Sequence, residues 1–550
     1  MWEQTAFNRR RISKEQGAII KDWGGRFPIA LAYPNAYYLG MSSLGFQTIY
    51  GLLNSFPEVV CERLFLDGVP NTSRGERTGG GRRSPGGIVA SASEFRTLSL
   101  ESGREAREFA VVGFSISFEI DYFNIVEMIR RSGIPLFARD RDEGDPLVMA
   151  GGPCVFANPA PIVPFFDFLV IGEGEPAMPV LIETLLATQQ ENRKVVLAEL
   201  SKIPGIYVPG VSPEPVKRIW AKDLDSFATT SVVYSDETEL GDMHLVEIAR
   251  GCGRACRFCL AGYAFRPVRY RSVKSILEAA QAGLRFRKRV GLVSAATSDH
   301  PEIDELATRL REMGALVAVS SLRLNPLSES LLKALIDSGT RTITFAPEAG
   351  SERLRSVINK QVAVEDVFRG VEMAARLGAR QLKLYFMAGL PSETDGDVKE
   401  IIDLSLECKE RFAKIKRGGR LTVSVTPFVP KAGTPFQWEA MADPATLKRR
   451  LAIIKSGLKR DSIDVRAESV DWSVVQAVLS RGDQRLSMVL ANMQDNSLAA
   501  WNEAMAGAGL SASDMTGPRD NDEVLPWSVI DLGGSTEAIR RQRDSALRRG

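Results

Sequence analysis

The chain has 550 residues, an apolar fraction of 44% and nearly balanced charges that leave a formal net charge of +2. This composition is typical of a soluble globular protein of roughly two or three domains, and it argues neither for nor against a nucleic-acid partner. There is no apolar run of about 18 residues and no signal-peptide pattern, so we expect no membrane span and a cytoplasmic location. Six cysteines, three of them in one loop, favour a metal site over a disulfide framework.

The first part of the chain has an α/β pattern. Residues 1–26 are polar and basic and predict a surface helix or arm, after which short apolar runs alternate with helical segments over residues 27–185. Buried parallel strands are expected at 29–33, 59–66, 110–115, 147–150 and 168–171. This alternation predicts a doubly wound, Rossmann-like domain. A Gly/Arg/Ser-rich stretch at 71–87 predicts a flexible surface insertion, with an RNA-contacting loop as the alternative.

Small and polar residues follow the ends of these strands. Ligands bind outside the carboxyl ends of the strands in such sheets, and glycine there lets a bulky ligand approach the backbone. The candidate ligand-binding residues of this edge are Asn35, Tyr38, Gly40, Ser115, Gly151, Gly152, Gly172 and Gly174.

The second part of the chain, residues 241–440, alternates again between expected strands and helices. Strands are expected at 245–249, 290–294, 316–321, 342–346, 382–387 and 421–426, with helices between them. Six βα repeats predict an open (β/α)6 barrel whose active site lies at the carboxyl ends of the strands. Residues 186–240, which contain several prolines, are expected to connect the two units, and residues 441–550 to form a helical extension.

A cysteine-rich loop follows the first expected strand of this barrel. Cys252, Cys256 and Cys259 form a C-x3-C-x2-C array. Tetrahedral zinc would need a fourth protein ligand, and the two histidines of the chain, His244 and His300, lie at no finger-like spacing. Three thiolates without a fourth suit a [4Fe–4S] cluster that leaves one iron open for a small molecule. A zinc loop or three unrelated core cysteines is the alternative.

This spacing, with Phe258 directly before the last cysteine, resembles the motif of the radical S-adenosylmethionine (radical SAM) enzymes. The resemblance implies that the three cysteines hold a [4Fe–4S] cluster, that S-adenosylmethionine (SAM) chelates its open iron, and that a donor such as flavodoxin or ferredoxin reduces it. A 5′-deoxyadenosyl radical is then released. The SAM-binding residues that the resemblance implies are Phe258, Ser294, Ser320, Arg323, Glu348, Ser351, Gly389 and Pro391.

Three of these residues have an expected partner in SAM. Arg323 is expected to pair with the methionine carboxylate, and Glu348, together with Ser351, to meet the ribose hydroxyls. Residues 294–296 read Ser-Ala-Ala where the family has a glycine-rich segment that contacts the methionine amino group of SAM. Here that contact would depend on backbone carbonyls and Ser294.

The first domain also carries a resemblance. An α/β domain before such a barrel, with NPAPIVPFFDFLVIGEGE at 158–175, is similar to the cobalamin-binding domain of class B radical SAM methylases. This implies cobalamin as a further cofactor, held by the edge residues named above. The D-x-H-x-x-G motif is missing, so the lower face of the cobalt would hold water, another side chain or nothing. A domain that kept its fold and lost its ligand is the alternative.

The resulting hypothesis is a cobalamin-dependent radical SAM enzyme that transfers a methyl group to an unactivated carbon. The alternatives are a radical SAM rearrangement, cyclisation or oxidation without methyl transfer, and a non-catalytic Fe–S or cobalamin sensor that binds nucleic acid. A methylthiotransferase is disfavoured because the N-terminal half offers only Cys61 and Cys154 for a second cluster. RNA, a peptide, a lipid and a small metabolite all remain open as substrates.

Overall fold

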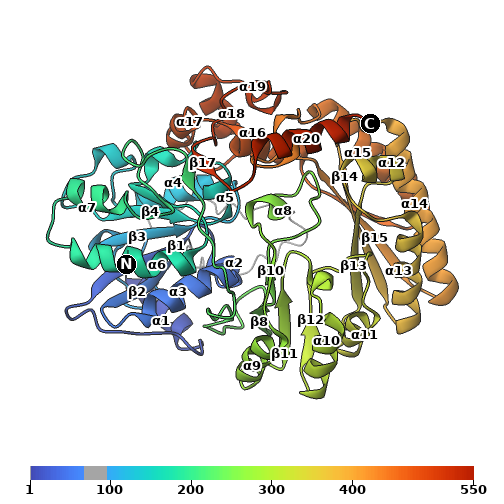
Figure 1. The fold of residues 1–550 in the computed structure, drawn as a ribbon, viewed down its shortest axis with the longest axis horizontal. Coiled ribbons are helices and arrows are strands. Elements are labelled where there is room, and N and C mark those ends of the chain that lie inside the picture. Colours follow the sequence, from blue (N-terminus) through green and yellow to red (C-terminus); the bar gives the residue numbers. More distant parts are fainter. Residues whose placement is uncertain (1, 67–95, 550) are drawn as a thin grey trace.

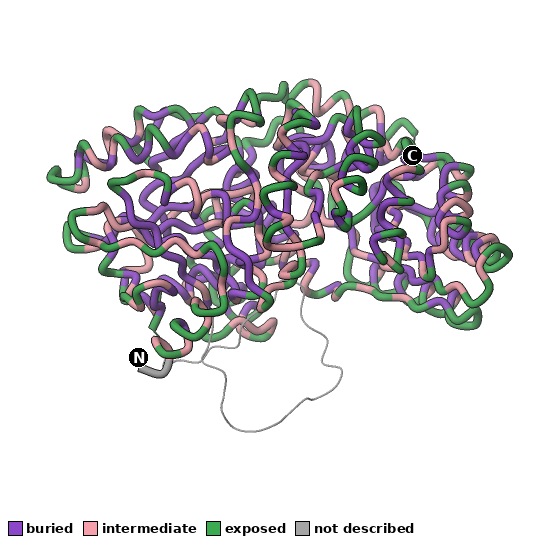
Figure 2. The backbone as a smooth tube through the Cα atoms, turned by 90° about the horizontal axis from the view of Figure 1, so that it is seen from below, coloured by how far each residue is buried: buried purple, intermediate pink, exposed green. Residues whose placement is uncertain are grey.

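The computed structural model describes residues 2–66 and 96–549, and the predicted insertion at 71–87 lies outside them. An N-terminal α/β lobe stands beside a partial barrel, and the C-terminal helices run across the same end of both (Figure 1). Buried segments fill the interior of each lobe, and exposed segments lie at the periphery (Figure 2). Within the described residues, every helix is too short or too polar to span a bilayer.

The N-terminal lobe contains a six-stranded sheet in the order β2-β1-β3-β4-β5-β6. Its strands are β1 (Phe27–Tyr33), β2 (Val59–Phe65), β3 (Val111–Ser115), β4 (Leu147–Gly151), β5 (Phe168–Val170) and β6 (Ile206–Tyr207). The five predicted strands are confirmed and are parallel, whereas β6 is an antiparallel edge strand within the expected connector. The order of β1 to β5 is flavodoxin-like, and it places a topological switch point between β1 and β3.

Helices cover both faces of this sheet. They are α1 (Trp2–Ile12), α2 (Tyr37–Gly40), α3 (Leu44–Ser55), α4 (Asp121–Arg131), α5 (Pro153–Ala157), α6 (Gly174–Ala187) and α7 (Arg193–Leu200), with short turns η1 (Ala106–Glu108), η2 (Ala138–Asp140) and η3 (Val163–Phe165). Successive residues of β1 point to opposite faces: Leu31 packs in the core beneath α3 and α6, and Ala32 in the core beneath α4. Because both faces are buried, the strands are continuous apolar runs rather than alternating ones.

The barrel consists of two parallel sheets. One contains β8 (Met243–Glu247), β11 (Arg289–Val293) and β12 (Leu316–Ala318), and the other contains β13 (Thr342–Glu348), β14 (Gln381–Ala388), β15 (Arg420–Pro427) and β16 (Asp464–Ala467). A single parallel bridge between Leu322 and Phe345 joins them. The six predicted strands are confirmed, but the expected end of the barrel at residue 440 is wrong, because β16 pairs with β15 beyond it.

The helices of the barrel lie on its outer side (Figure 1). They are α9 (Val273–Leu284), α10 (Ile303–Glu312), α11 (Glu329–Asp337), α13 (Val364–Leu377), α14 (Asp395–Ile415) and α15 (Pro444–Lys459). Shorter elements near the strand ends are β9 (Ala249–Arg250), α8 (Ala261–Ala264), β10 (Arg269–Tyr270), η4 (Thr297–Asp299), α12 (Glu352–Val357) and η5 (Pro435–Trp438).

Most of the C-terminal helices pack onto the N-terminal lobe, whereas the last one, α20 (Thr536–Leu547), packs against α12 and η5 of the barrel. The others are α16 (Val470–Arg481), α17 (Leu486–Asn492), α18 (Leu498–Gly507) and α19 (Ala512–Thr516). Trp501 meets Phe123 of α4 edge to face at 5.5 Å, and the short strand β17 (Ile530–Asp531) pairs with β7 (Val216–Lys217) of the expected connector. The buried carboxylate of Glu119 accepts hydrogen bonds from Lys431 at 2.6 Å and Ser480 at 2.8 Å. These contacts hold the two lobes together.

Candidate active site

The cysteine loop lies between β9 and α8 and is held from outside by the residues that follow α12. The backbone N–H of Arg257, between the second and third cysteines, donates to the carbonyl of Ile358 at 3.0 Å. Its guanidinium donates to the carbonyl of Val357 at 2.6 Å. The side-chain amide of Asn359 donates to the carbonyl of Ala255 at 2.9 Å. The loop conformation is therefore set by a distant segment as well as by its own sequence.

The three thiols are largely shielded from solvent. Cys252 and Cys256 are buried and Cys259 is half-buried. Burial raises the pKa of the Cys256 thiol to about 11, against the opposing effect of the Lys360 charge. Burial also raises the pKa of Cys259, and the neighbouring Cys252 contributes to that rise. Since thiolates are the metal ligands, a positively charged centre must hold them ionised, which an iron cluster would do.

The arrangement of these thiols differs from that of a single-ion site. Within residues 2–66 and 96–549, no three Cys, His, Asp or Glu side chains are gathered closely enough to hold one metal ion. A cubane bonds each thiolate to a different iron, so its ligands need not converge on one point. Both histidines have structural partners: His244 lies at 2.8 Å from the hydroxyl of Tyr234, and His300 at 3.0 Å from the carbonyl of Arg271. The donor set fits a three-cysteine cluster better than zinc.

Two predicted SAM residues belong to charged networks beside this loop. Glu348 has a φ of +71° and pairs with Lys360 at 3.1 Å. Arg323 lies 3.5 Å from the carboxylate of Asp299. The same carboxylate binds Arg254 of the cysteine loop at 2.8 Å. The structure therefore connects the predicted SAM residues to the predicted cluster loop.

The hydroxyl of Ser351 is engaged differently from the expectation. It accepts from the backbone N–H of Leu354 at 3.1 Å as the N-cap of α12, and it donates to the carboxylate of Asp397. The residue is 2% exposed. A buried hydroxyl that accepts from the first turn and donates to a carboxylate serves as a helix cap, and its contact with the ribose stays a prediction.

The remaining predicted SAM residues lie at strand ends and loops. Gly389 has a φ of +87°, and its N–H donates to the carboxylate of Glu393 at 2.6 Å. Pro391 is buried beside it, and Ser320 is exposed after β12. The hydroxyl of Ser294 accepts from the N–H of Ala296 at 3.1 Å, and Phe258 packs against a small apolar cluster that includes Phe428.

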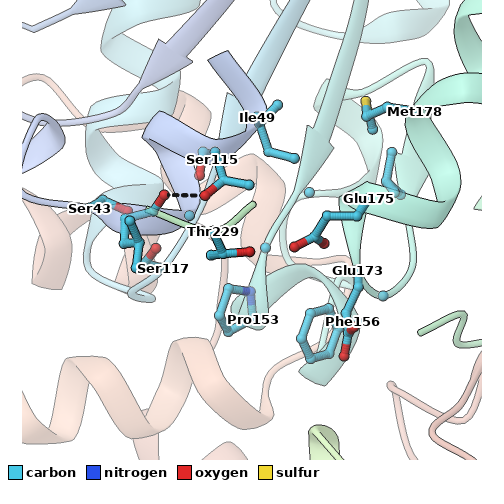
Figure 3. A pocket seen from close by; sticks show the side chains of 18 of the residues that line it. Ser43, Ile49, Ser115, Ser117, Pro153, Phe156, Glu173, Glu175, Met178 and Thr229 are labelled. Atoms are coloured by element: carbon cyan, nitrogen blue, oxygen red, sulfur yellow. Dashed lines mark hydrogen bonds between the residues drawn. The ribbon is translucent and has the colours of Figure 1, made fainter. Parts of the chain in front are cut away.

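A cavity of about 340 Å³ lies at the carboxyl edge of the N-terminal sheet. Five predicted edge residues line it: Ser115, Gly151, Gly152, Gly172 and Gly174. The hydroxyls of Ser115 and Ser117 lie on one side, and the carboxylates of Glu173 and Glu175 on the other (Figure 3). The apolar lining comes mainly from Leu31, Leu44, Ile49, Phe114, Met149, Phe156, Val170 and Met178.

The other three predicted edge residues do not reach the cavity. The side-chain amide of Asn35 is buried and donates to Asp121 at 2.9 Å. Tyr38 is 41% exposed, and Gly40 packs beneath the ring of Phe65, where an added Cβ would lie at 2.5 Å. The chain enters α2 directly after β1, so this loop turns its side chains away from the cavity.

Two of the cavity glycines are required by the packing of the backbone itself. A Cβ on Gly152, at a φ of +114°, would lie 2.4 Å from the carbonyl oxygen of Ile116. A Cβ on Gly172, at a φ of +121°, would lie 2.1 Å from the carbonyl oxygen of Ile219. The neighbouring backbone therefore excludes a side chain at both positions, and their contact with a ligand stays a prediction.

Sequence reasoning missed a charged cluster between the cavity and the cysteine loop. Arg250, two residues before Cys252, binds Glu173 at 2.9 Å, Glu175 at 2.6 Å and Glu247 at 2.9 Å. Although burial opposes ionisation, the hydrogen bond from Arg269 and the charge of Arg250 hold the pKa of Glu173 below its usual value. The signal was present in the strand-end segments GEGE and EIARGC.

Comparisons with known proteins agree with this geometry. Residues 88–209 match the family model "Radical SAM proteins, N-terminal", and residues 246–405 match "Radical SAM superfamily". The protein MJ0966 of Methanocaldococcus jannaschii is 33% identical over 409 residues, which cover 72% of this chain and 84% of the relative. The methyltransferase PH0819 of Pyrococcus horikoshii is 24% identical over 286 residues, which cover 48% of this chain and 59% of the relative.

A solved structure shows the same fold. The cobalamin-dependent SAM radical enzyme OxsB, with aqua-cobalamin and SAM bound, superposes with a TM-score of 0.50 at 13% identity, covering 95% of this chain and 79% of that one. The cysteine array, the barrel behind it and the matches to both family models lead to one conclusion: this chain belongs to the radical SAM superfamily.

Proposed function

We propose that this protein is a cobalamin-dependent radical SAM methyltransferase that forms a 5′-deoxyadenosyl radical and methylates an unactivated carbon. The observation that carries the proposal is a cavity shared by both lobes. Ser115 and Gly151 line it from the N-terminal sheet, and Glu247, Arg250 and Val293 line it from the barrel. A ligand there would lie against the strands that precede the cluster loop, where two cofactors must act on one substrate.

The residues that would hold each group follow from their positions. Cys252, Cys256 and Cys259 would hold the [4Fe–4S] cluster, and Arg323 and Glu348 are the charged groups available to SAM beside it. The cluster and SAM supply the radical chemistry when bound, and the protein supplies orientation and exclusion of water. Arg257 contributes by fixing the loop through its hydrogen bonds to the carbonyls of the last turn of α12.

Cobalamin is the cofactor proposed for the shared cavity. OxsB, whose fold this chain shares, is described with aqua-cobalamin and SAM bound, and the carboxyl edge of a doubly wound sheet is where such ligands bind. The cavity of about 340 Å³ is at the lower end of small-molecule sites, so a corrinoid would extend from it toward the barrel. Among the described residues, no histidine lines the cavity, so the groups that would hold the corrinoid there are the apolar side chains, hydroxyls and backbone of its lining.

The test uses the full chain, reconstituted anaerobically with iron, sulfide and hydroxocobalamin and then desalted. We expect retained corrinoid by visible absorbance, 5′-deoxyadenosine after reduction in the presence of SAM, and methyl transfer to the substrate once one is found. Release of 5′-deoxyadenosine without retained corrinoid would favour rearrangement, cyclisation or oxidation. Absence of 5′-deoxyadenosine from an iron-loaded preparation would favour the non-catalytic sensor.

A matched pair of variants locates the corrinoid. Gly45 of α3 lines the cavity, and a Cβ added to it meets nothing within 4 Å. Gly45→Phe should therefore fill the cavity without distorting the helix and should abolish corrinoid retention while iron content is unchanged. Gly507 of α18 has equally open surroundings away from the cavity, so Gly507→Phe should retain corrinoid like the wild type.

A further inference from the structure

The sheet formed by β13, β14 and β15 has an inner face that differs from its outer face. Leu382, Leu384 and Phe386 of β14 are buried in the core beneath α13 and α14. Because side chains alternate along a strand, Lys383 and Tyr385 point to the opposite face. Helices α13 and α14 lie outside this sheet, and its inner face is turned toward β8, β11 and β12 (Figure 1).

This inner face carries polar side chains in register. Lys383 stands opposite Thr344 on β13 and Thr422 on β15, and Tyr385 stands opposite Ser424. The hydroxyl of Thr422 accepts from the side-chain amide of Gln381 at 2.9 Å, and the other members of the row are half-buried. The interior of a closed (β/α)8 barrel is usually filled by branched apolar side chains. Here the inner face of β13, β14 and β15 carries hydroxyls and the Lys383 ammonium at these positions instead.

Lys383 differs from the other cations near the barrel interior. Its ammonium donates to the hydroxyl of Tyr385 at 2.7 Å. Lys360 pairs with Glu348 at 3.1 Å, whereas no carboxylate of the described residues lies within ion-pair distance of Lys383. The same ammonium lies 4.5 Å from the centre of the Tyr385 ring, so this ring and its hydroxyl compensate part of the charge. The hydroxyl donors around the ammonium match an anion with several oxygens.

We propose that this face, centred on Lys383 and Tyr385, binds a phosphate or carboxylate group of the substrate. The ammonium would supply the charge. The hydroxyl oxygen of Tyr385 accepts from Lys383, so its O–H would be available to donate a hydrogen bond to the anion. The hydroxyls of Thr344 and Ser424 would lie on either side of the anion. The proposal rests on the proposed function, since it names the substrate class of that enzyme.

The height of the site within the barrel suits this role. Lys383 and Tyr385 lie in the middle of β14 (Gln381–Ala388), whereas Gly389 of the predicted SAM site follows the end of that strand. A substrate anchored through its anionic group would therefore extend toward the carboxyl ends of the strands. Its reactive end would then meet the cofactors, as catalysis by positioning requires.

The experiment measures anion binding to the iron-loaded full chain by calorimetry, with inorganic pyrophosphate in one arm and citrate in the other. We expect one of them to bind, which identifies the phosphate or the carboxylate class, and binding should weaken with salt. Lys383→Met should weaken it by at least about tenfold, as expected for loss of a charge-assisted hydrogen bond. Lys383→Arg should restore most of it, and Tyr385→Phe should weaken it by a smaller factor.

The control is Lys333→Met, which makes the same change at a lysine that is exposed on α11. Iron content and thermal midpoint report whether each variant is folded. If Lys383→Met does not fold, the test depends on Tyr385→Phe and Lys383→Arg. Binding of neither anion at millimolar concentration, or equal weakening by Lys333→Met, would overturn the proposal. Formation of 5′-deoxyadenosine by the wild type tests the proposed function separately, so either proposal can fail while the other stands.

Discussion

The cysteine loop and the N-terminal cavity are neighbours, but they are built in opposite ways. The three cysteines are close in the sequence, on one loop between β9 and α8. The cavity takes its lining from four strands of the first sheet, from α3, α5 and α6, and from the barrel. The sequence of one loop brings the three ligands near one another, although the contacts of Arg257 and Asn359 with a distant segment set its conformation. A cavity assembled from many elements depends on the packing of all of them.

The two regions also differ in how their charges are paired, and one residue connects them. Beside the cysteine loop the ion pairs are separate, Arg254 with Asp299 and Lys360 with Glu348, whereas at the cavity Glu173, Glu175 and Glu247 share one arginine. Arg250 binds all three carboxylates from a position two residues before the first cysteine. The position of the cluster loop relative to the cavity is therefore set by a buried ion-pair cluster.

The largest effect is expected from breaking the loop itself. Replacing Cys252, Cys256 and Cys259 together with alanine should reduce bound iron to background and abolish SAM cleavage, because thiolates are the only ligands proposed for the cluster. Iron analysis and visible absorbance of anoxically purified protein measure it. Cys408→Ala is the control, since that thiol is buried in the barrel core away from the loop, and undiminished iron in the triple variant would refute the cluster assignment.

The connection between the regions can be broken at Arg250. Arg250→Gln leaves the buried carboxylate of Glu175 without its ion pair, whereas Glu173 keeps Arg269 and Glu247 keeps Arg271. The loss of this pair should lower the free energy of unfolding by about 3 kcal/mol. Arg250→Lys keeps the charge but loses the planar fork and should be intermediate. Denaturant unfolding of the iron-loaded protein measures both. Lys448→Met removes an exposed ion pair with Asp471 and should cost under about 1 kcal/mol, so equal losses at the two sites would contradict the argument.

A smaller, pH-dependent effect on folding stability is expected at Asp121, whose carboxylate accepts a hydrogen bond from Asn35. Burial raises the pKa of Asp121 to about 7, although Asn35 opposes the rise. The folded chain thus holds a proton that the unfolded chain loses at lower pH, so stability falls as the pH rises toward 7 and stays lower above it. Asp121→Asn lacks this titration. Its stability relative to wild type should rise by about 2 kcal/mol between pH 5.5 and pH 8.

Chemical denaturation of both proteins at several pH values measures this difference. A constant difference between wild type and Asp121→Asn across that range would show that Asp121 is ionised throughout. The same result would mean that the surroundings of Asn35 are more polar than the buried geometry indicates.

Much of the fold could be predicted because its signals are local. The strands of both lobes are apolar runs bounded by loops, and they were found within a few residues of their true ends. Strand β16 was missed because its sequence, Asp-Val-Arg-Ala, is short and half polar, and its pairing with β15 identifies it only in three dimensions. The C-terminal helices were recognised as helices, but amphipathic sequence does not say which surface a helix will cover.

The same distinction between local sequence signals and tertiary packing applies to the site. The spacing of Cys252, Cys256 and Cys259 is sufficient by itself to indicate an iron–sulfur loop, because their ligand role requires only that one short loop bring three thiolates together. The tertiary structure decided which glycines line the cavity, which group Asn35 contacts, and that Arg250 joins three carboxylates. These properties depend on distances between segments far apart in the chain, and such distances follow from packing and not from the order of residues.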